Sequence, residues 1–272
     1  METIMMWDAV PGKCEETPVL DYYPAAEKKS DAAVIILPGG GFSGRCGWHE
    51  GSMYADLLND CGMDAFICQY RVYPHTFPLP LLDVRRAVRY IRANAERFGI
   101  DPNKIAVMGS SAGGQLAALV STYTAPIDFE DTDEIDKIDS MPNAAVLCYP
   151  AIHYPHDGLC VEPDMLSMYY DCYSKFAGED MDILLSLSPD RLVKDCTPPT
   201  FIWHNADDTV APVINSYLYA TALRRHNIPC EMHIFPHGGH GLGPAPYHPH
   251  VAQWTGLLIN WFHHINWLPE QA

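Results

Sequence analysis

The chain has 272 residues and carries 17 Lys and Arg against 34 Asp and Glu, which gives a formal net charge of −17. So acidic a chain repels phosphate backbones and anionic headgroups, which argues against nucleic acid and membranes as partners. No apolar run is long enough to span a bilayer, and the start of the chain shows no signal-peptide pattern. None of the nine cysteines forms a C-x-x-C motif, so we expect free thiols and a cytoplasmic location.

Strands and helices are predicted to alternate along most of the chain. Two N-terminal strands, near residues 4–7 and 19–23, are expected to form an antiparallel edge. Further strands are expected at 34–37, 65–70, 105–109, 144–149, 201–204 and 231–235, and helices at 52–61, 80–98, 213–226 and 251–265. Such alternation predicts an α/β fold with a mostly parallel sheet and helices on both faces. Residues 1–272 are predicted to form one domain.

The helix expected at 80–98 has apolar residues at helical spacing on one face. Its arginines lie largely off that face, and we interpret them as a solvated surface: Arg85, Arg86, Arg89 and Arg92. The acidic segment at 128–136 lacks the glycine and the final acid of a calcium-binding EF-hand loop. It is therefore expected to be a solvated loop.

Residues 151–185 break the alternation and are predicted to form a cap insertion. The segment is rich in Tyr, Met, Asp and Pro. Aromatic side chains suit the faces of sugars or aryl groups. The alternative is ordinary packing of the insertion on the sheet.

A run of glycines, Pro38-Gly39-Gly40-Gly41-Phe42, follows the strand at 34–37. Consecutive glycines let backbone N–H groups approach an oxyanion closely, and Gly40 and Gly41 are predicted donors. Extended to Gly44, the run also fits the dinucleotide-binding pattern G-x-G-x-x-G. That alternative is disfavoured because the next strand ends in Tyr70 and Arg71 rather than in an acid.

The segment Gly109-Ser110-Ser111-Ala112-Gly113 lies between a predicted strand and a predicted helix. Strand, G-x-S-x-G and helix together are typical of a nucleophile elbow, in which the serine occupies a sharp, strained turn. Ser111 is therefore the predicted nucleophile, and the N–H of Ala112 the predicted second oxyanion donor. The alternative is a Ser/Gly cap that opens a helix.

A candidate acid and a candidate base follow two later strands. Asp207 and Asp208 come after the strand at 201–204, and His237 and His240 come after the strand at 231–235. An exposed, glycine-flanked loop suits a base that must reach Ser111. The order Ser, Asp, His is the one found in α/β-hydrolases. From the residues alone, either aspartate and either histidine fits.

Three aromatic residues, Trp48, Tyr70 and Tyr149, are predicted to line the substrate pocket, because they lie near the carboxyl ends of strands or in the glycine loop. The pair His248 and His250 has no accompanying cysteine or acid cluster, and a base loop explains the other histidine pair. No metal site is predicted.

Six segments resemble those of small α/β-hydrolase esterases, most closely bacterial carbohydrate esterases of the acetylxylan/feruloyl esterase type, with hormone-sensitive-lipase-like esterases as cousins. They are Pro38–Phe42, Tyr70–Pro74, Asp101–Ile105, Gly109–Gly114, Pro198–Phe201 and His237–Leu242. The likeness runs from about Ala33 to Trp261, although Pro38 replaces the histidine that opens the related lipase motif. It favours Asp207 and His240 over their neighbours.

The resemblance implies a serine carboxylesterase that needs no metal or organic cofactor. Its substrates would be small acyl esters, such as acetylated xylan fragments. Two alternatives are kept: another hydrolase of this fold, lipase or peptidase-like, and a non-enzymatic binding protein. An exposed apolar cap would also offer a dimer surface, so a homo-oligomer stays open.

Overall fold

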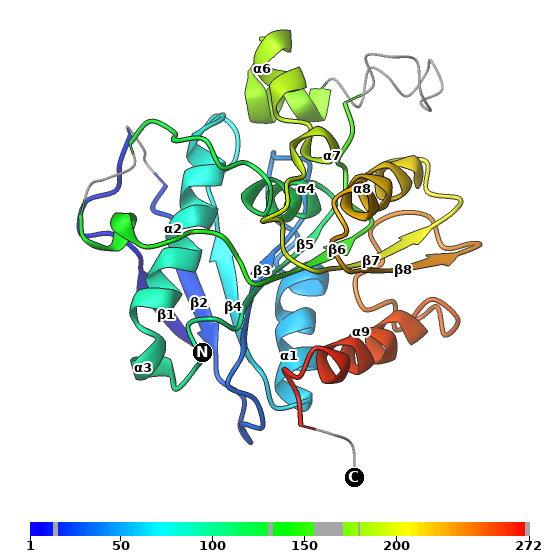
Figure 1. Cartoon of the computed structure of the whole chain (residues 1–272), viewed down its shortest axis with the longest axis horizontal. Coiled ribbons are helices and arrows are strands. Elements are labelled where there is room, and N and C mark those ends of the chain that lie inside the picture. Colours follow the sequence, from blue (N-terminus) through cyan, green and yellow to red (C-terminus); the bar gives the residue numbers. More distant parts are fainter. Residues whose placement is uncertain (13–15, 130–132, 155–170, 179, 270–272) are drawn as a thin grey trace.

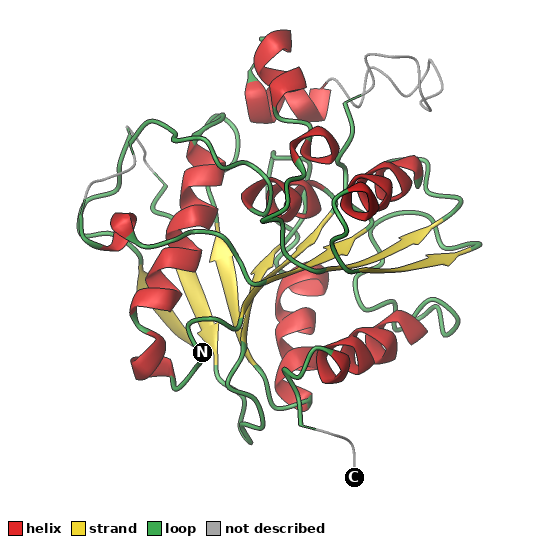
Figure 2. Cartoon of the chain, in the orientation of Figure 1, coloured by secondary structure: helices red, strands yellow, loops and turns green. Residues whose placement is uncertain are grey.

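The computed structural model describes residues 1–12, 16–129, 133–154, 171–178 and 180–269. At its centre lies an eight-stranded sheet in the order β1-β2-β4-β3-β5-β6-β7-β8 (Figures 1 and 2). β2 pairs antiparallel with both neighbours, and all other pairs are parallel. The strands are β1 (Glu2–Met5), β2 (Val19–Tyr23), β3 (Ala33–Leu37), β4 (Asp64–Gln69), β5 (Ile105–Ser110), β6 (Ala144–Cys148), β7 (Thr200–Asn205) and β8 (Cys230–Phe235). The predicted antiparallel edge and parallel sheet are confirmed.

Helices cover both faces of this sheet. Figure 1 shows α1 (Met53–Asp60) and α9 (Gln253–His264) on one face, with α2 (Leu79–Ala93), α4 (Ala112–Val120) and α8 (Ile214–Arg225) on the other. Short helical elements in the described ranges include a π-helical turn (Trp48–Ser52), a 3₁₀ turn (Ile135–Lys137), α3 (Ala95–Phe98), α6 (Met181–Ser186) and α7 (Pro189–Leu192). No helix in the described ranges is long and apolar enough to cross a membrane.

The two faces of the sheet form two separate apolar cores, as β3 illustrates. Ala33, Ile35 and Leu37 pack in the core on the α2 and α4 side, and Val34 and Ile36 pack in the core on the α1 and α9 side. Side chains alternate along a strand, so a strand covered on both faces is apolar throughout. The carboxyl ends of the parallel strands consequently meet at one edge, where the loops that carry the candidate residues begin.

The helix expected at 80–98 is interrupted at Asn94. The Asn94 side-chain amide donates to the carbonyl of Tyr90 (2.8 Å), and its own N–H bonds to the carbonyls of Tyr90 and Ile91. These contacts end α2 and leave α3 as a separate turn. Asparagine favours such local side-chain bonds over a regular helix.

The prediction that the arginines of α2 form a solvated face is wrong for three of the four, and only Arg92 is partly exposed. Arg85, Arg86 and Arg89 are all less than a tenth exposed. Arg86 pairs with Asp133 (2.6 Å) and Asp136 (2.9 Å), so part of the acidic segment packs on α2 instead of lying in solvent. Carboxylates and carbonyls of the segment after α4 accept hydrogen bonds from the guanidinium groups of all three residues.

The predicted cap falls partly outside the described residues, since 155–170 and 179 are not described. Within the described part, residues 171–177 are helical. Phe176 of this helix stacks on Phe42 of the glycine loop, with ring centroids 4.6 Å apart. This helix therefore packs directly on the glycine loop. That residues 151–185 as a whole form a cap stays a prediction.

A fully buried ion pair joins the end of β4 to α2. Arg71 contacts Asp83 at 2.6 Å, and Asp83 also accepts the backbone N–H of Arg71 (2.7 Å). Burial of two charges contributes little net stability when both are present, but an orphaned buried charge is costly.

We expect Asp83→Leu to lower the free energy of unfolding by about 3–5 kcal/mol, because the buried Arg71 guanidinium loses the carboxylate that contacts it at 2.6 Å. The double variant Arg71→Met with Asp83→Leu should regain much of that loss. Urea titrations followed by circular dichroism measure both. A loss below about 1 kcal/mol in the single variant would contradict this assignment.

Candidate active site

The predicted nucleophile Ser111 lies between β5 and α4 in a strained conformation. Its φ is 53° and its ψ is −119°, a region that residues other than glycine rarely adopt. A Cβ on Gly109 would lie 2.1 Å from the carbonyl oxygen of Gly113, and one on Gly113 would lie 2.0 Å from that of Leu37. Only glycine permits this approach, so the turn has the geometry of a nucleophile elbow.

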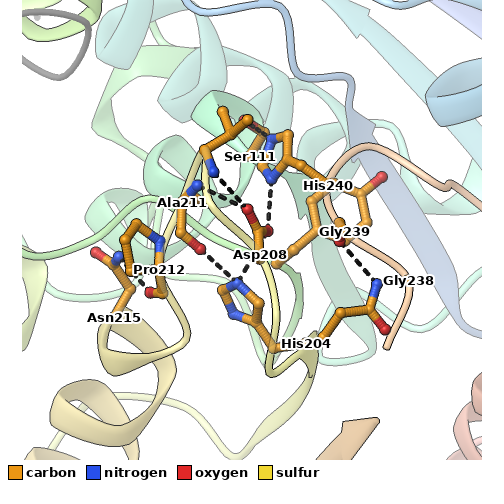
Figure 3. Close-up of polar contacts among 12 residues, drawn as sticks. Ser111, His204, Asp208, Ala211, Pro212, Asn215, Gly238, Gly239 and His240 are labelled. Carbon is orange, nitrogen blue, oxygen red and sulfur yellow. Dashed lines mark hydrogen bonds and ion pairs between the residues drawn. The ribbon is translucent and has the colours of Figure 1, made fainter. Parts of the chain in front are cut away.

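His240 connects Ser111 to a carboxylate. The His240 Nε2 atom lies 2.8 Å from Ser111 Oγ, and the Nδ1 atom lies 2.6 Å from Asp208 Oδ2 (Figure 3). A carboxylate can only accept, so Nδ1 carries the proton and Nε2 is free to accept the serine hydroxyl. This chain of contacts can activate a serine hydroxyl as a nucleophile.

The carboxylate in this chain is Asp208, and the prediction of Asp207 is wrong. Asp208 is buried, and its Oδ1 accepts the backbone N–H groups of Val210 (2.8 Å) and Ala211 (2.9 Å). These two bonds turn its side chain inward. Neighbouring residues in one tight turn point in different directions, so the two aspartates differ in direction although they are adjacent in sequence.

A second histidine, His204 at the end of β7, also contacts Asp208. Its Nε2 lies 3.2 Å from Asp208 Oδ2 and 2.7 Å from the carbonyl of Ala211, and both partners are acceptors. Burial opposes ionisation of Asp208, but hydrogen bonds from His204 and His240 outweigh it and hold the pKa of this carboxyl below its usual range. Asp208 therefore stays ionised wherever His240 can act as a base. No pattern in the sequence pointed to His204.

Asp207 has a different position, on the exposed side of the same turn. Its Oδ1 accepts the N–H groups of Gly238 and Gly239, each at 2.9 Å. The N–H groups of Gly239 and then Gly238 lower the pKa of the Asp207 carboxyl. Asp207 thus anchors the backbone of the loop that carries His240. The alternative base His237 lies 3.4 Å from Asp207 and is mostly exposed.

The glycine loop lies beside Ser111. The N–H of Gly39 donates to Glu50 Oε2 (2.8 Å) and is not free, whereas Gly41 and Ala112 line a pocket together with Ser111. Gly40 is not among the lining residues, so its predicted part in an oxyanion hole stays a prediction. The pocket is small and open to solvent, and its other lining residues are Phe42, Gln115, Ala151, Cys172, Tyr173, Val210 and Ala211.

Glu50 joins the glycine loop to the histidine loop through a buried network. Its Oε1 accepts the hydroxyl of Tyr149 (2.7 Å), and that hydroxyl in turn accepts the N–H of Gly243 (3.0 Å). The Tyr149 ring also packs edge-on against His240, with centroids 5.0 Å apart. With Gly39 on its other oxygen, the Glu50 carboxylate holds both loops in one arrangement.

Of the three predicted pocket aromatics, two have structural roles. Tyr70 and Tyr149 are fully buried, and neither lines the pocket. The Tyr70 hydroxyl donates to the carbonyl of Pro38 and so supports the glycine loop. The prediction of substrate contact is wrong for both. Trp48 is 68 % exposed and lies outside the pocket lining, so its contact with substrate stays a prediction.

One group in the described part of the chain has the chemistry of metal ligands, namely Cys46, His49 and Glu50, whose ligand atoms lie within 4.8 Å of one another. Both oxygens of Glu50 already accept hydrogen bonds. Burial and then Glu50 raise the pKa of the Cys46 thiol, which disfavours the thiolate that binds metals. We assign no metal role to this group.

A parallel sheet with a strained serine after β5, a carboxylate after β7 and a histidine after β8 defines an α/β-hydrolase fold. Within this class the chain belongs to the BD-FAE family, whose model matches residues 20–223.

Two named relatives are similar to this chain in sequence. The chain is 36 % identical over 216 residues to endo-1,4-beta-xylanase B of Butyrivibrio fibrisolvens, covering 78 % of this chain and 32 % of the relative. It is 30 % identical over 251 residues to an acetylxylan esterase of Xylanibacter ruminicola, covering 90 % and 48 %. The chain thus spans about a third to a half of the length of these relatives.

Among solved structures, the acetyl ester-xyloside bifunctional hydrolase of Caldicellulosiruptor lactoaceticus superposes with a TM-score of 0.87. It is 37 % identical, and the alignment covers 98 % of this chain and 97 % of that one. The alignment therefore extends over nearly the whole of both chains.

We expect Asp208→Asn to slow labelling of Ser111 by a fluorophosphonate probe by about 10⁴-fold, because the amide no longer holds the His240 tautomer that accepts the serine proton. The matched variant Asp207→Asn keeps an acceptor for the loop N–H groups and should label within about threefold of wild type. The rate of label incorporation measures both. The reverse ranking would restore Asp207 as the orienting carboxylate.

We also expect Glu50→Gln to slow the same labelling by about tenfold, since an amide can accept from only one of the two groups that Glu50 holds. Tyr149→Phe removes the hydroxyl but keeps the ring against His240. If Glu50 acts through Tyr149, the two losses should not add in the double variant. Additive effects would show that the two loops are held independently.

Proposed function

We propose that the protein is a serine carboxylesterase that hydrolyses small acyl esters of sugars, such as acetylated xylan fragments. The observation that carries the proposal is the pair of hydrogen bonds of His240, 2.8 Å to Ser111 Oγ and 2.6 Å to Asp208 Oδ2. The names of the xylan-active relatives support a sugar as the alcohol.

In the first half of the reaction, Ser111 Oγ attacks the ester carbonyl carbon while His240 Nε2 takes the serine proton. The N–H groups of Gly41 and Ala112, which line the pocket beside Ser111, stabilise the negative charge on the carbonyl oxygen. The C–O bond to the alcohol then breaks, and His240 returns the proton to the leaving oxygen. An acyl-serine remains.

In the second half, His240 removes a proton from water as the water attacks the acyl carbon. The C–O bond to Ser111 breaks, Oγ recovers a proton from His240, and a carboxylic acid is released. Ionised Asp208 stabilises the imidazolium form of His240 in both halves. The chemistry needs no metal or organic cofactor, because side chains supply the nucleophile and every proton transfer.

We expect Ser111→Ala to lower kcat for p-nitrophenyl acetate by about 10⁶-fold, as loss of a catalytic serine does elsewhere. Ser110→Ala is the matched control, because Ser110 is buried and bonded to the Tyr54 hydroxyl (2.9 Å) instead of to His240. Circular dichroism checks that both variants fold. Activity that survives in Ser111→Ala and vanishes in Ser110→Ala would show that Ser110 is the nucleophile instead of Ser111.

For the sugar, acetate release from acetylated xylo-oligosaccharides is compared with release from p-nitrophenyl acetate. A kcat/KM for the sugar ester at or above the aryl value, despite its poorer leaving group, supports recognition of the sugar. Hydrolysis of the aryl ester alone would contradict the assignment of a sugar ester as the substrate, but the proposed esterase activity would stand.

A further inference from the structure

The pocket beside Ser111 contains a buried amide, that of Gln115. The residue completes the first turn of α4, since its N–H donates to the carbonyl of Ser111 (3.0 Å). Side chains in a helix lean toward its N-terminus, so the Gln115 side chain leans toward Ser111. Gln115 is fully buried and is one of the residues that line the pocket.

Only one end of this amide is satisfied. Its nitrogen donates to the hydroxyl of Tyr154, whereas Oε1 is buried and accepts no hydrogen bond from any residue that the structure describes. A buried carbonyl oxygen without a donor is costly, and such atoms are rare in folded proteins. The Gln115 amide therefore brings an acceptor without a donor to a pocket with largely apolar surroundings, which Phe42, Ala151 and Val210 help to form.

The pocket lies on the acyl side of the ester. Gly41 and Ala112, the proposed oxyanion donors, line it together with Ser111, whereas His240 does not. The leaving alcohol must lie beside His240 Nε2 to receive its proton. The alcohol is therefore outside the pocket, and the acyl chain is inside it, facing Gln115.

We propose that the acyl pocket selects short acyl groups that carry a hydroxyl group, with 3-hydroxybutyryl esters as the test case, and that Gln115 is the residue that determines this specificity. The inference rests on the proposed esterase function. Gln115 lies in the first turn of α4, directly after Ser111, so its amide is within reach of a short acyl group on the serine.

The experiment compares p-nitrophenyl 3-hydroxybutyrate with p-nitrophenyl butyrate, which have the same leaving group. The kcat/KM ratio of the two esters is divided by their ratio in alkaline hydrolysis, which removes the effect of the hydroxyl on intrinsic reactivity. The wild type should prefer the hydroxy ester by about tenfold, the factor expected from one hydrogen bond of typical strength.

In Gln115→Met, which keeps the length of the side chain but has no amide, the corrected ratio should fall to about one. Both esters are measured in the same protein, so a general loss of folded or active enzyme cancels. Leu116→Met is the control on the same helix: Leu116 is buried outside the pocket, and the ratio should stay at the wild-type value.

Three results would overturn the inference. The first is wild-type activity on butyrate with a corrected ratio near one. The second is a preference that persists in Gln115→Met. The third is a stronger preference for the 3-oxobutyryl ester, which would mean that the amide presents its N–H groups to the pocket. Wild-type inactivity on every ester is a different outcome, because it would overturn the esterase function itself.

Discussion

The site depends on the close approach of three backbone segments around Ser111. β3, β5 and the start of α4 meet where Gly109 and Gly113 leave no room for a Cβ atom. This packing holds Ser111 at a positive φ, a strain of about 1–3 kcal/mol that the buried strands and helix offset. Because β5 lies in the middle of the parallel sheet, the serine hydroxyl projects at the edge where the other strands also end.

Two buried carboxylates then set the positions of the loops at that edge. Asp208 accepts from the backbone of its own turn and from His204 and His240, so the imidazole is held at one angle to Ser111. Glu50 accepts from the glycine loop and from Tyr149, which contacts the histidine loop. In a buried setting such fully satisfied acceptors rigidify their neighbours. The elbow, glycine loop and histidine loop are therefore preorganised relative to one another.

The strands and most helices could be predicted because elements that are buried contain runs or patterns of apolar residues that are visible in the local sequence. The burial of the arginines of α2 could not be predicted. An arginine on the polar side of a helix is expected to be exposed to solvent. Arg86 is instead buried in ion pairs with Asp133 and Asp136, which lie about 50 residues further along the chain. Tyr70 and Tyr149 were misassigned for a related reason, since a place at a strand end does not tell whether the side chain faces a pocket or the core.

The sequence by itself determined the elbow serine, the glycine loop and the histidine loop, because glycine spacing is a local requirement of close backbone approach and strained turns. Only the tertiary structure decided between Asp207 and Asp208. Both follow the same strand, and both have ionised carboxylates. What separates them is direction: the N–H groups of Val210 and Ala211 turn Asp208 inward to His240, whereas those of Gly238 and Gly239 hold Asp207 outside. Which aspartate contacts His240 depends on how two distant loops pack against each other. Two adjacent residues of the same type carry no sequence signal of that packing.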